Sequence, residues 1–214
     1  QDAVRRCSSE GYFCEKISIE KLKHFVSKEA FNIDGLGKKI VENFWNLNLI
    51  KLPQDIFNLN FDKIKKLEGW GNLSVQNLRY SIDEKKKISL ERFIYSLGIR
   101  HIGLENAKIL SKYFKSFSNF KELQKNKKFD DLINIDGIGE TQTNSIKDFF
   151  SNKINLIVLN ELAKILIIND YAVKKKNGLL NNKTFLVTGK LKGISRAEIK
   201  SLIEENSGTT VSSV

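Results

Sequence analysis

The sequence predicts a mainly α-helical protein. Its 214 residues contain a single proline, and apolar residues recur at helical spacing along most of the chain, whereas alternating, strand-like runs are scarce. A short turn also recurs, in which two glycines flank one apolar residue and a helical run follows at once. Clear copies are residues 33–37, 67–71 and 135–139, and a weaker copy is residues 99–103.

The apolar spacing and the turn residues give the order of the elements. We expect a short amphipathic helix around Leu22 and Phe25 before the first turn. Asn72 and Ser89 are expected N-caps, and Gly98 is an expected helix stop. Further helical segments are expected at residues 38–46, 53–57, 61–67, 73–86, 90–97, 104–114, 117–120, 140–150 and 154–169.

The last forty residues follow a different pattern. Residues 174–178 combine a lysine run with a glycine and read as a linker. A strand at residues 184–187 is followed by the turn Thr188-Gly189, a capping box at 195–198, a helix ending before Gly208 and a second strand. This order predicts a separate α/β unit. Because residues 208–214 look like a strand that is cut short, we expect this unit to be incomplete and residues 184–214 to be partly disordered or irregularly packed.

The turns recur with a regular period. Their second glycines, Gly37, Gly71, Gly103 and Gly139, are 34, 32 and 36 residues apart. Tetratricopeptide repeats have a similar period. They lack a Gly-apolar-Gly turn in each unit, however, and their Trp, Tyr, Ala and Pro signature is absent here.

The composition favours a polyanionic partner. The chain has a formal net charge of +11, with 41% hydrophobic and 29% charged residues, and nucleic acid is the first partner that such a charge suggests. A general bias towards Lys, Asn and Ile explains the charge equally well. No apolar run is long enough to span a bilayer, so we expect a cytoplasmic protein without a membrane partner, and a monomer.

The turns have the form of an anion site. Glycine lets the backbone approach a phosphate closely, and the N–H groups of the turn and of the following helix then bind its oxygens without reading a base. Leu36, Trp70, Ile102 and Ile138 are expected to pack between the helices. The alternative is that each turn is a tight connector that binds nothing. The expected phosphate-binding residues are Gly35, Gly37, Lys38, Gly69, Gly71, Arg100, Gly103, Lys108, Gly137 and Gly139, with Lys39 as a further cation.

The third turn differs from the others. His101 stands where the other copies have their first glycine. Because a residue with a β-carbon adopts positive φ less readily, we expect this turn to hold phosphate less closely. The side chain of His101 is expected to point to solvent or to the backbone, and solvent is the simpler expectation.

These turns resemble the helix–hairpin–helix motif, and the chain as a whole resembles the C-terminal half of the bacterial NAD-dependent DNA ligase family. The resemblance is carried by HFVSKEAFNIDGLG at residues 24–37, by RFIYSLGIRHIG at 92–103, by the cysteine loop and by Thr188-Gly189. It implies part of a four-cysteine zinc finger at residues 1–22, four DNA-binding helix–hairpin–helix motifs at 23–174, and a truncated BRCT domain at 175–214. The chain then reads as a fragment of a longer protein.

The same resemblance assigns cofactors and partners. Cys7 and Cys14 match the third and fourth zinc ligands; from the residues alone they read as free thiols. With two ligands absent the zinc site does not close. Asp2, Glu10 and His24 are candidates to complete it, although a lone His on an apolar helix is usually structural. The family seals nicks in duplex DNA during replication and repair, using NAD and Mg²⁺ that would bind outside this chain.

Catalytic chemistry is not expected within these residues. Adenylation in this family needs a Lys-x-Asp-Gly motif, but Asn32 and Asn134 stand where its lysine would precede Asp34 and Asp136. The two aspartates therefore read as turn residues, and the fragment alone is expected to be inactive. Two alternatives stay open: a stand-alone helix–hairpin–helix module of a repair nuclease or branch-migration complex, and a protein-interaction scaffold that binds no DNA.

Overall fold

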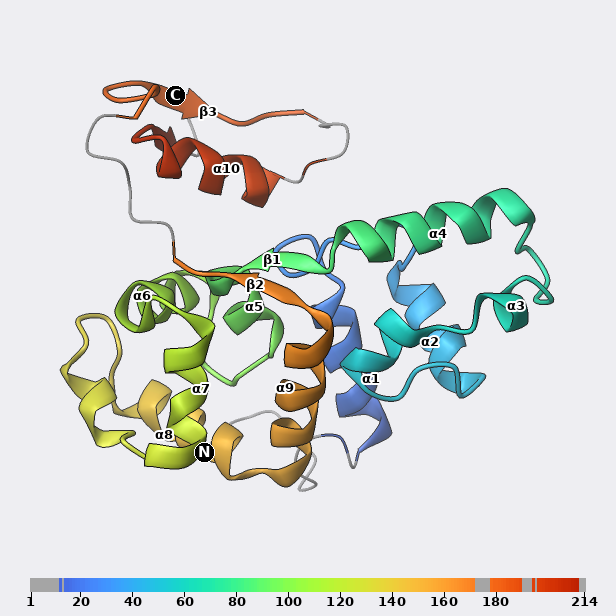
Figure 1. Cartoon of the computed structure of the whole chain (residues 1–214), viewed down its shortest axis with the longest axis horizontal. Helices are drawn as coiled ribbons and strands as arrows, with labels where there is room; N and C mark the ends of the chain where they lie inside the picture. Colours follow the sequence, from blue (N-terminus) through green and yellow to red (C-terminus); the bar gives the residue numbers. More distant parts are fainter. Residues whose placement is uncertain (1–11, 13, 172–177, 190–193, 195, 212–214) are drawn as a thin grey trace, which may run out of the picture.

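The computed structural model describes residues 12, 14–171, 178–189, 194 and 196–211, and it confirms a mainly α-helical fold (Figure 1). No helix in these ranges has the length and apolar character needed to cross a membrane. The α-helices are α1 (Glu15–Phe25), α2 (Lys38–Asn46), α3 (Phe61–Ile64), α4 (Asn72–Glu84), α5 (Leu90–Ser96), α6 (Leu104–Phe114), α7 (Phe117–Asn126), α8 (Glu140–Ser151), α9 (Lys153–Ile165) and α10 (Arg196–Glu205). The 3-10 helices are η2 (Pro53–Asn58) and η3 (Asp130–Asn134), and the strands are β1 (Lys87–Ser89), β2 (Ile167–Asn169), β3 (Thr184–Leu186) and β4 (Thr209–Val211).

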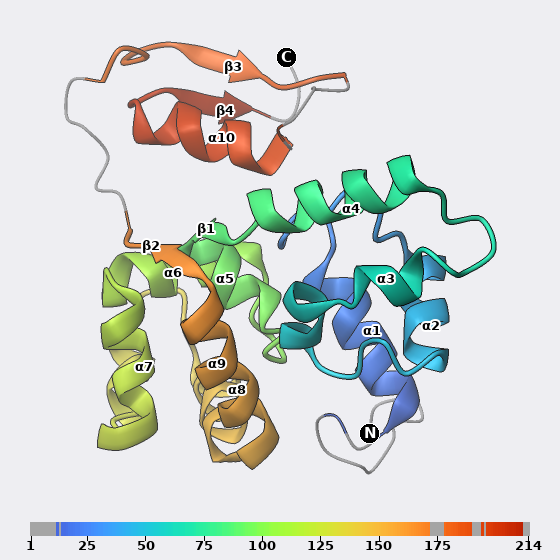
Figure 2. The same cartoon turned by 45° about the vertical axis from the view of Figure 1, so that its right-hand side comes forward.

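The helices form two neighbouring lobes (Figures 1 and 2). Helices α1 to α4 carry the first two turns, and α5 to α9 carry the last two. The lobes touch where η2 packs against α9. Each lobe therefore contains one pair of successive turns.

The sequence did not predict one parallel strand pair. It joins the segment before α5, at the start of the second lobe, to the segment after α9, at the end of that lobe. Strand β1 pairs with β2, in the register Lys87↔Ile167 and Ser89↔Asn169, and the N–H of Ile167 also donates to the carbonyl of Lys86 at 2.8 Å. The helices expected over 73–86 and 154–169 were therefore too long at their C-terminal ends. Three-residue strands are too short for alternation to show in the sequence.

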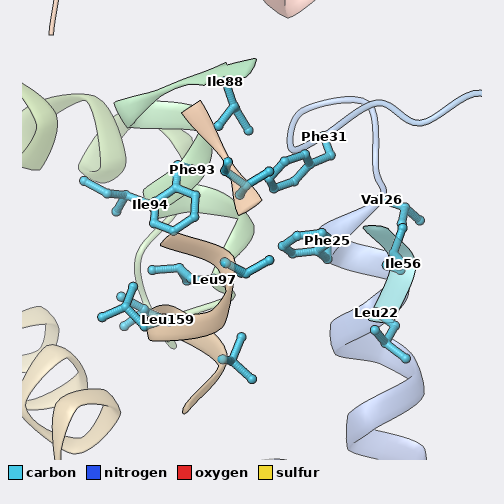
Figure 3. Packing of buried hydrophobic residues seen from close by; sticks show 14 of the residues in the cluster. Leu22, Phe25, Val26, Phe31, Ile56, Ile88, Phe93, Ile94, Leu97 and Leu159 are labelled. Carbon is cyan, nitrogen blue, oxygen red and sulfur yellow. The ribbon is translucent and has the colours of Figure 1, made fainter. Parts of the chain in front are cut away.

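One hydrophobic core runs between the lobes. The rings of Phe25 and Phe31 stack with centroids 4.3 Å apart, and the Phe57 ring lies edge-on, 5.5 Å from that of Phe31. Figure 3 shows Phe25 and Phe31 pointing towards Phe93 and Leu97 of the second lobe. Burying such large aromatic side chains is worth several kcal/mol, about 1.5–3 kcal/mol for each one, so the two lobes stabilise each other.

The three expected helix ends are only partly confirmed. Gly98 is the expected stop, with φ of +60°, and its N–H donates to the Tyr95 carbonyl at 3.1 Å. Asn72 is not an N-cap: Gly71 takes that place and Asn72 is the first helical residue. Ser89 is the N-cap of α5, but its hydroxyl donates to Oε1 of Glu91 at 2.8 Å instead of accepting from the helix.

The C-terminal residues form the expected strand–helix–strand unit. Strands β3 and β4 are parallel, in the register Thr184↔Thr209 and Leu186↔Val211, and α10 connects them. In the described residues the two strands and the helix have regular hydrogen bonding, and the expected partial disorder or irregular packing of this segment stays a prediction. Most of the expected linker, residues 174–177, and Ser195 of the expected capping box lie outside the described residues.

Helix α10 contacts the helical lobes through the Glu198 carboxylate and through Ser201, whose hydroxyl donates to Oε1 of Glu91 at 3.4 Å. Oε1 of Glu198 lies 2.9 Å from Nζ of Lys85 and 2.8 Å from NH1 of Arg92. Arg92 is a buried residue of α5, and its NH2 group also donates to the carbonyls of Lys28, at 3.0 Å, and Ala30. Glu198 therefore links the C-terminal unit to both lobes.

Candidate nucleic-acid interface

The four turns share one backbone geometry. The residue at the first glycine position has φ of +87° in Gly35, +80° in Gly69, +61° in His101 and +86° in Gly137. In each turn the N–H of the next residue donates to the carbonyl three residues earlier, over 2.9–3.3 Å. The third turn thus has the same conformation as the glycine copies, although His101 has a β-carbon. Weaker phosphate binding at this turn stays a prediction.

The second glycine of each turn is the N-cap of the helix that follows. Gly37, Gly71, Gly103 and Gly139 all have extended backbone, and their carbonyls accept the first helical hydrogen bond, at 2.9–3.1 Å. In the part of the chain that the structure describes, no protein acceptor meets the N–H groups of the first three. A helix start with open N–H groups carries partial positive charge and attracts anions.

The fold itself does not need glycine at three of these positions. A β-carbon added to Gly37, Gly71 or Gly103 would meet no atom of the described residues within 4 Å, apart from those of chain neighbours. Their φ values of −66°, −91° and −80° suit any residue. Packing and backbone strain therefore leave these glycines unexplained, whereas the close approach of an external group to the turn would explain them.

The fourth turn is already occupied. The N–H of Gly139 donates to Oε1 of Gln142 at 3.2 Å, so the helix caps itself. Acidic residues flank this turn on both sides, Asp136 before it and Glu140 after it, and both are exposed. From the sequence, the fourth turn is one of the three clear copies. In the structure its N–H group is already bonded and its neighbours are acidic, so of the four turns it is the least suited to bind an anion.

The apolar residue inside each turn packs as expected. Leu36, Ile102 and Ile138 are buried. Trp70 is half-buried, and its ring lies 5.4 Å from that of Phe44. These four side chains hold the turns against the core, so the backbone on the outer side keeps a fixed shape.

The turns within each lobe face each other. Gly35 and Gly69 line one hollow of about 550 Å³ together with Trp70 and Leu78. In the other lobe, Nδ1 of His101 lies 3.1 Å from Oγ of Ser145 in α8, and a β-carbon at Gly137 would lie 2.7 Å from Cδ1 of Ile109 in α6. Each turn of this second pair thus touches the helix that follows the other turn.

The expected cations are distributed unevenly. Lys38 and Lys39 are exposed at the start of α2, and within the described residues neither forms an ion pair. Arg100 is exposed beside the third turn. Lys108 is paired with Glu105, at 3.2 Å from its Oε1, which reduces the positive charge that it offers. The first and third turns are the more basic ones.

The described residues do not form a metal site. Cys14 is a half-buried free thiol at the N-cap of α1, and Cys7 lies outside the described residues. No group of three metal-binding side chains occurs among the residues that the structure places. His24, a possible fourth ligand, has Nε2 within 2.7 Å of the Tyr95 carbonyl, so its ring already has a structural partner.

Nothing at Asp34 or Asp136 suggests catalysis. Both carboxylates are exposed on the turns, and neither has an ion pair or hydrogen bond within the described part of the chain. This placement agrees with their expected role as turn residues. Sequence reasoning missed Gln142 and Ser145, although a Gln three residues after an N-cap is a capping-box signal that was available for the first.

Four turns of one geometry, each opening a helix, have the form of the helix–hairpin–helix motif. The comparison with known families agrees: the helix-hairpin-helix motif matches residues 92–159, which contain the third and fourth turns.

Known proteins similar to the chain are DNA ligases. It is 68% identical over 214 residues to the DNA ligase of Pelagibacter ubique (strain HTCC1062), covering 100% of this chain and 32% of that enzyme. It is 39% identical over 226 residues to the DNA ligase of Rickettsia bellii (strain RML369-C), covering 100% and 33%, and 43% identical over 205 residues to that of Wolbachia pipientis wMel, covering 93% and 31%. The expected resemblance to DNA ligases is confirmed, and the chain spans about a third of the length of these relatives.

Proposed function

We propose that this chain is the DNA-binding portion of a DNA ligase and that its hairpin turns hold the phosphate backbone of duplex DNA at a nick. The observation that carries the proposal is the open space at Gly37, Gly71 and Gly103, where neither packing nor backbone strain requires glycine. A phosphate oxygen that accepts from these N–H groups would come within reach of the turn only without a β-carbon in the way.

Charge supports the same reading. The chain carries a net charge of +11, and Lys38, Lys39 and Arg100 lie at the first and third turns. Backbone N–H groups and cations that contact phosphates read no bases. The grip would therefore be independent of DNA sequence, as an enzyme that seals nicks anywhere in a genome requires.

The test is binding of nicked duplex DNA by the chain and by Gly37→Ser, Gly71→Ser and Gly103→Ser. Serine is at least as good an N-cap as glycine, so the folded state should keep its stability while the side chain fills the open space. We expect each variant to bind about threefold to tenfold more weakly, since one phosphate contact is lost. The matched control is Gly139→Ser, whose N–H is already taken by Gln142.

The outcomes of this binding test distinguish the proposal from its alternatives. Binding that weakens steeply with salt indicates phosphate neutralisation. If all three variants bind like the parent, the turns are not the contact. If the chain fails to bind any duplex at low salt, then both the ligase proposal for this part and the stand-alone DNA-binding alternative are wrong, and the scaffold alternative gains support.

The chemistry of the whole enzyme belongs to the proposal as well. NAD would supply the AMP group and Mg²⁺ would assist its transfer, both bound outside this chain, because the chain contains no Lys-x-Asp-Gly motif. We expect the chain alone to take no label from NAD, and a labelled chain would contradict this. We expect the enzyme in the cytoplasm.

The proposed domains are residues 1–22 as part of a zinc finger, 23–174 as the hairpin motifs and 175–214 as the start of a BRCT domain. Zinc binding would need Cys7 and Cys14 together with ligands from outside this chain, since the described residues do not fit a zinc site by themselves. Elemental analysis of the purified chain should therefore find less than one zinc per molecule.

A further inference from the structure

His101 keeps a side chain at a position where the backbone favours glycine. Its φ is +61°, and the equivalent positions in the other turns are Gly35, Gly69 and Gly137. The residue is exposed, so core packing does not explain a histidine there. What holds the imidazole is a contact with the neighbouring hairpin.

The hydrogen bonds around Ser145 assign the tautomer of His101. Oγ of Ser145 lies 2.9 Å from the carbonyl of Thr141, which can only accept, so the hydroxyl hydrogen belongs to that bond. The same Oγ lies 3.1 Å from Nδ1 of His101 and must therefore accept from an Nδ1–H group. The other ring nitrogen, Nε2, has no partner among the described residues.

The backbone of the turn is held from both sides. The carbonyl of His101 accepts from Nδ2 of Asn106 at 3.0 Å, and the N–H of Ile102 donates to the Ile99 carbonyl at 3.1 Å. The backbone and Nδ1 are both held in place, so the orientation of the ring is fixed. Nε2 is then the ring nitrogen that is available to a ligand. His101 precedes Gly103 by two residues, and the N–H group of Gly103 has no acceptor among the described residues.

We propose that His101 is a phosphate ligand of the third hairpin, with Ser145 orienting its imidazole so that Nε2–H of the charged ring donates to a DNA phosphate oxygen. The proposal rests on the proposed function. Histidine changes its charge between about pH 5 and pH 8, and a charged donor binds phosphate more strongly than a neutral one. DNA affinity should therefore gain a pH-dependent part from this residue.

Charged residues of both signs lie on the elements around the ring. Arg100 precedes His101, and on α6 the residues Glu105 and Lys108 pair with each other at 3.2 Å. On α8, Glu140 and Asp148 are exposed and carry negative charge. A phosphate oxygen bound at Nε2 would pair with the charged ring.

The test measures the affinity of the full chain for nicked duplex DNA at about pH 6 and about pH 8. His101→Gly restores the residue of the other turns and removes only the ring. Ser145→Ala removes the group that orients it. The chain contains two histidines, so His24→Gln, whose position bonds the Tyr95 carbonyl, is the matched control.

We expect the parent chain and His24→Gln to bind about threefold to tenfold more tightly at the lower pH. His101→Gly should lose this gain and bind like the parent at the higher pH, and Ser145→Ala should show a smaller gain than the parent. A His101→Gly variant that keeps the full gain overturns the inference. The inference is also overturned if His101→Gly melts at lower temperature than the parent but keeps the same DNA affinity at both pH values. The His101–Ser145 bond would then only stabilise the fold.

These outcomes are separate from failure of the proposed function. If the parent binds no DNA at either pH, the DNA-binding proposal itself is wrong. If the parent binds in a salt-dependent way and His101→Gly does the same at both pH values, only the role of His101 is wrong.

Discussion

Arg92 in α5 and Glu198 in α10 form an ion pair between residues 106 positions apart, with NH1 and Oε1 separated by 2.8 Å. The arginine is 4% exposed and the side chain of the glutamate 24%. The pair is therefore shielded from solvent on the side of the helical lobes, and it joins the C-terminal unit to a buried residue of the second lobe.

Replacing Arg92 by methionine should destabilise the protein by about 3 kcal/mol, because the carbonyls of Lys28 and Ala30 lose their donor and Glu198 loses a partner. Urea unfolding measures the change. Lys86→Met is the control, since the Lys86–Asp83 pair is solvent-exposed and its loss should cost less than about 0.5 kcal/mol. Equal losses for the two variants would mean that burial of Arg92 does not matter.

Gly137→Ala should destabilise more than Gly69→Ala. Both glycines have positive φ, which costs alanine about 1 kcal/mol, but only at Gly137 would the β-carbon meet another residue, Cδ1 of Ile109 at 2.7 Å. We expect the loss at Gly137 to be larger by about 1 kcal/mol, as measured by chemical denaturation.

A second substitution tests the cause of that difference. Ile109→Val removes Cδ1, so it should cost less in the Gly137→Ala background than in the parent, and the double-mutant cycle measures the coupling. Additive effects would show that the turn has moved away from α6 instead of pressing on it.

Lys38→Gln should weaken binding to duplex DNA and reduce the slope of log affinity against log salt by about one unit, because one fewer phosphate is neutralised. Titrations at several salt concentrations supply both numbers. Lys164→Gln is the matched control, since Lys164 is paired with Glu161 at 2.5 Å. An unchanged slope for Lys38→Gln would remove this lysine from the interface.

The stability of the protein should also respond to the charge of Glu205. Burial, and then the charge of Glu91, raise the pKa of the Glu205 carboxyl above its ordinary value. The folded state then holds this proton more tightly than the unfolded state, so the free energy of unfolding falls as pH rises from the ordinary pKa through the raised one.

Glu205→Gln should therefore be more stable than the parent at neutral pH, by about 0.5 kcal/mol at most because the group is largely solvated. The gain should disappear in acid, where the parent is protonated too. Thermal unfolding across this pH range gives the comparison. A gain that grows on acidification would contradict the assigned direction.

The sequence was sufficient for features that depend on near neighbours. The four turns, the helices that follow them and the burial of Leu36, Ile102 and Ile138 all follow from local pattern, because a glycine turn and the helix after it lie within a few residues. The same holds for β3, α10 and β4. Helix ends were less accurate, as at Asn72 and Ile165, because ends are set partly by tertiary contacts.

The candidate site was only partly predictable. The N–H group of the fourth turn is bonded because the side chain of Gln142 accepts from it. The capping-box spacing that signals this bond was present in the sequence but was not used in the prediction. The partner of His101 is Ser145, 44 residues away in sequence, and no local pattern connects them. The sequence therefore supplied the candidate residues, whereas the ranking of the four turns required the contacts between hairpins.

The β1–β2 pair has a consequence for how the protein folds. Its partners are about 80 residues apart in sequence, so its hydrogen bonds form only after the chain of the second lobe has closed a long loop. Helices and turns can form early from local contacts, and the parallel pair would then complete the domain last. A nascent chain that has not yet emerged beyond Ile167 should hold its hairpins without this final closure.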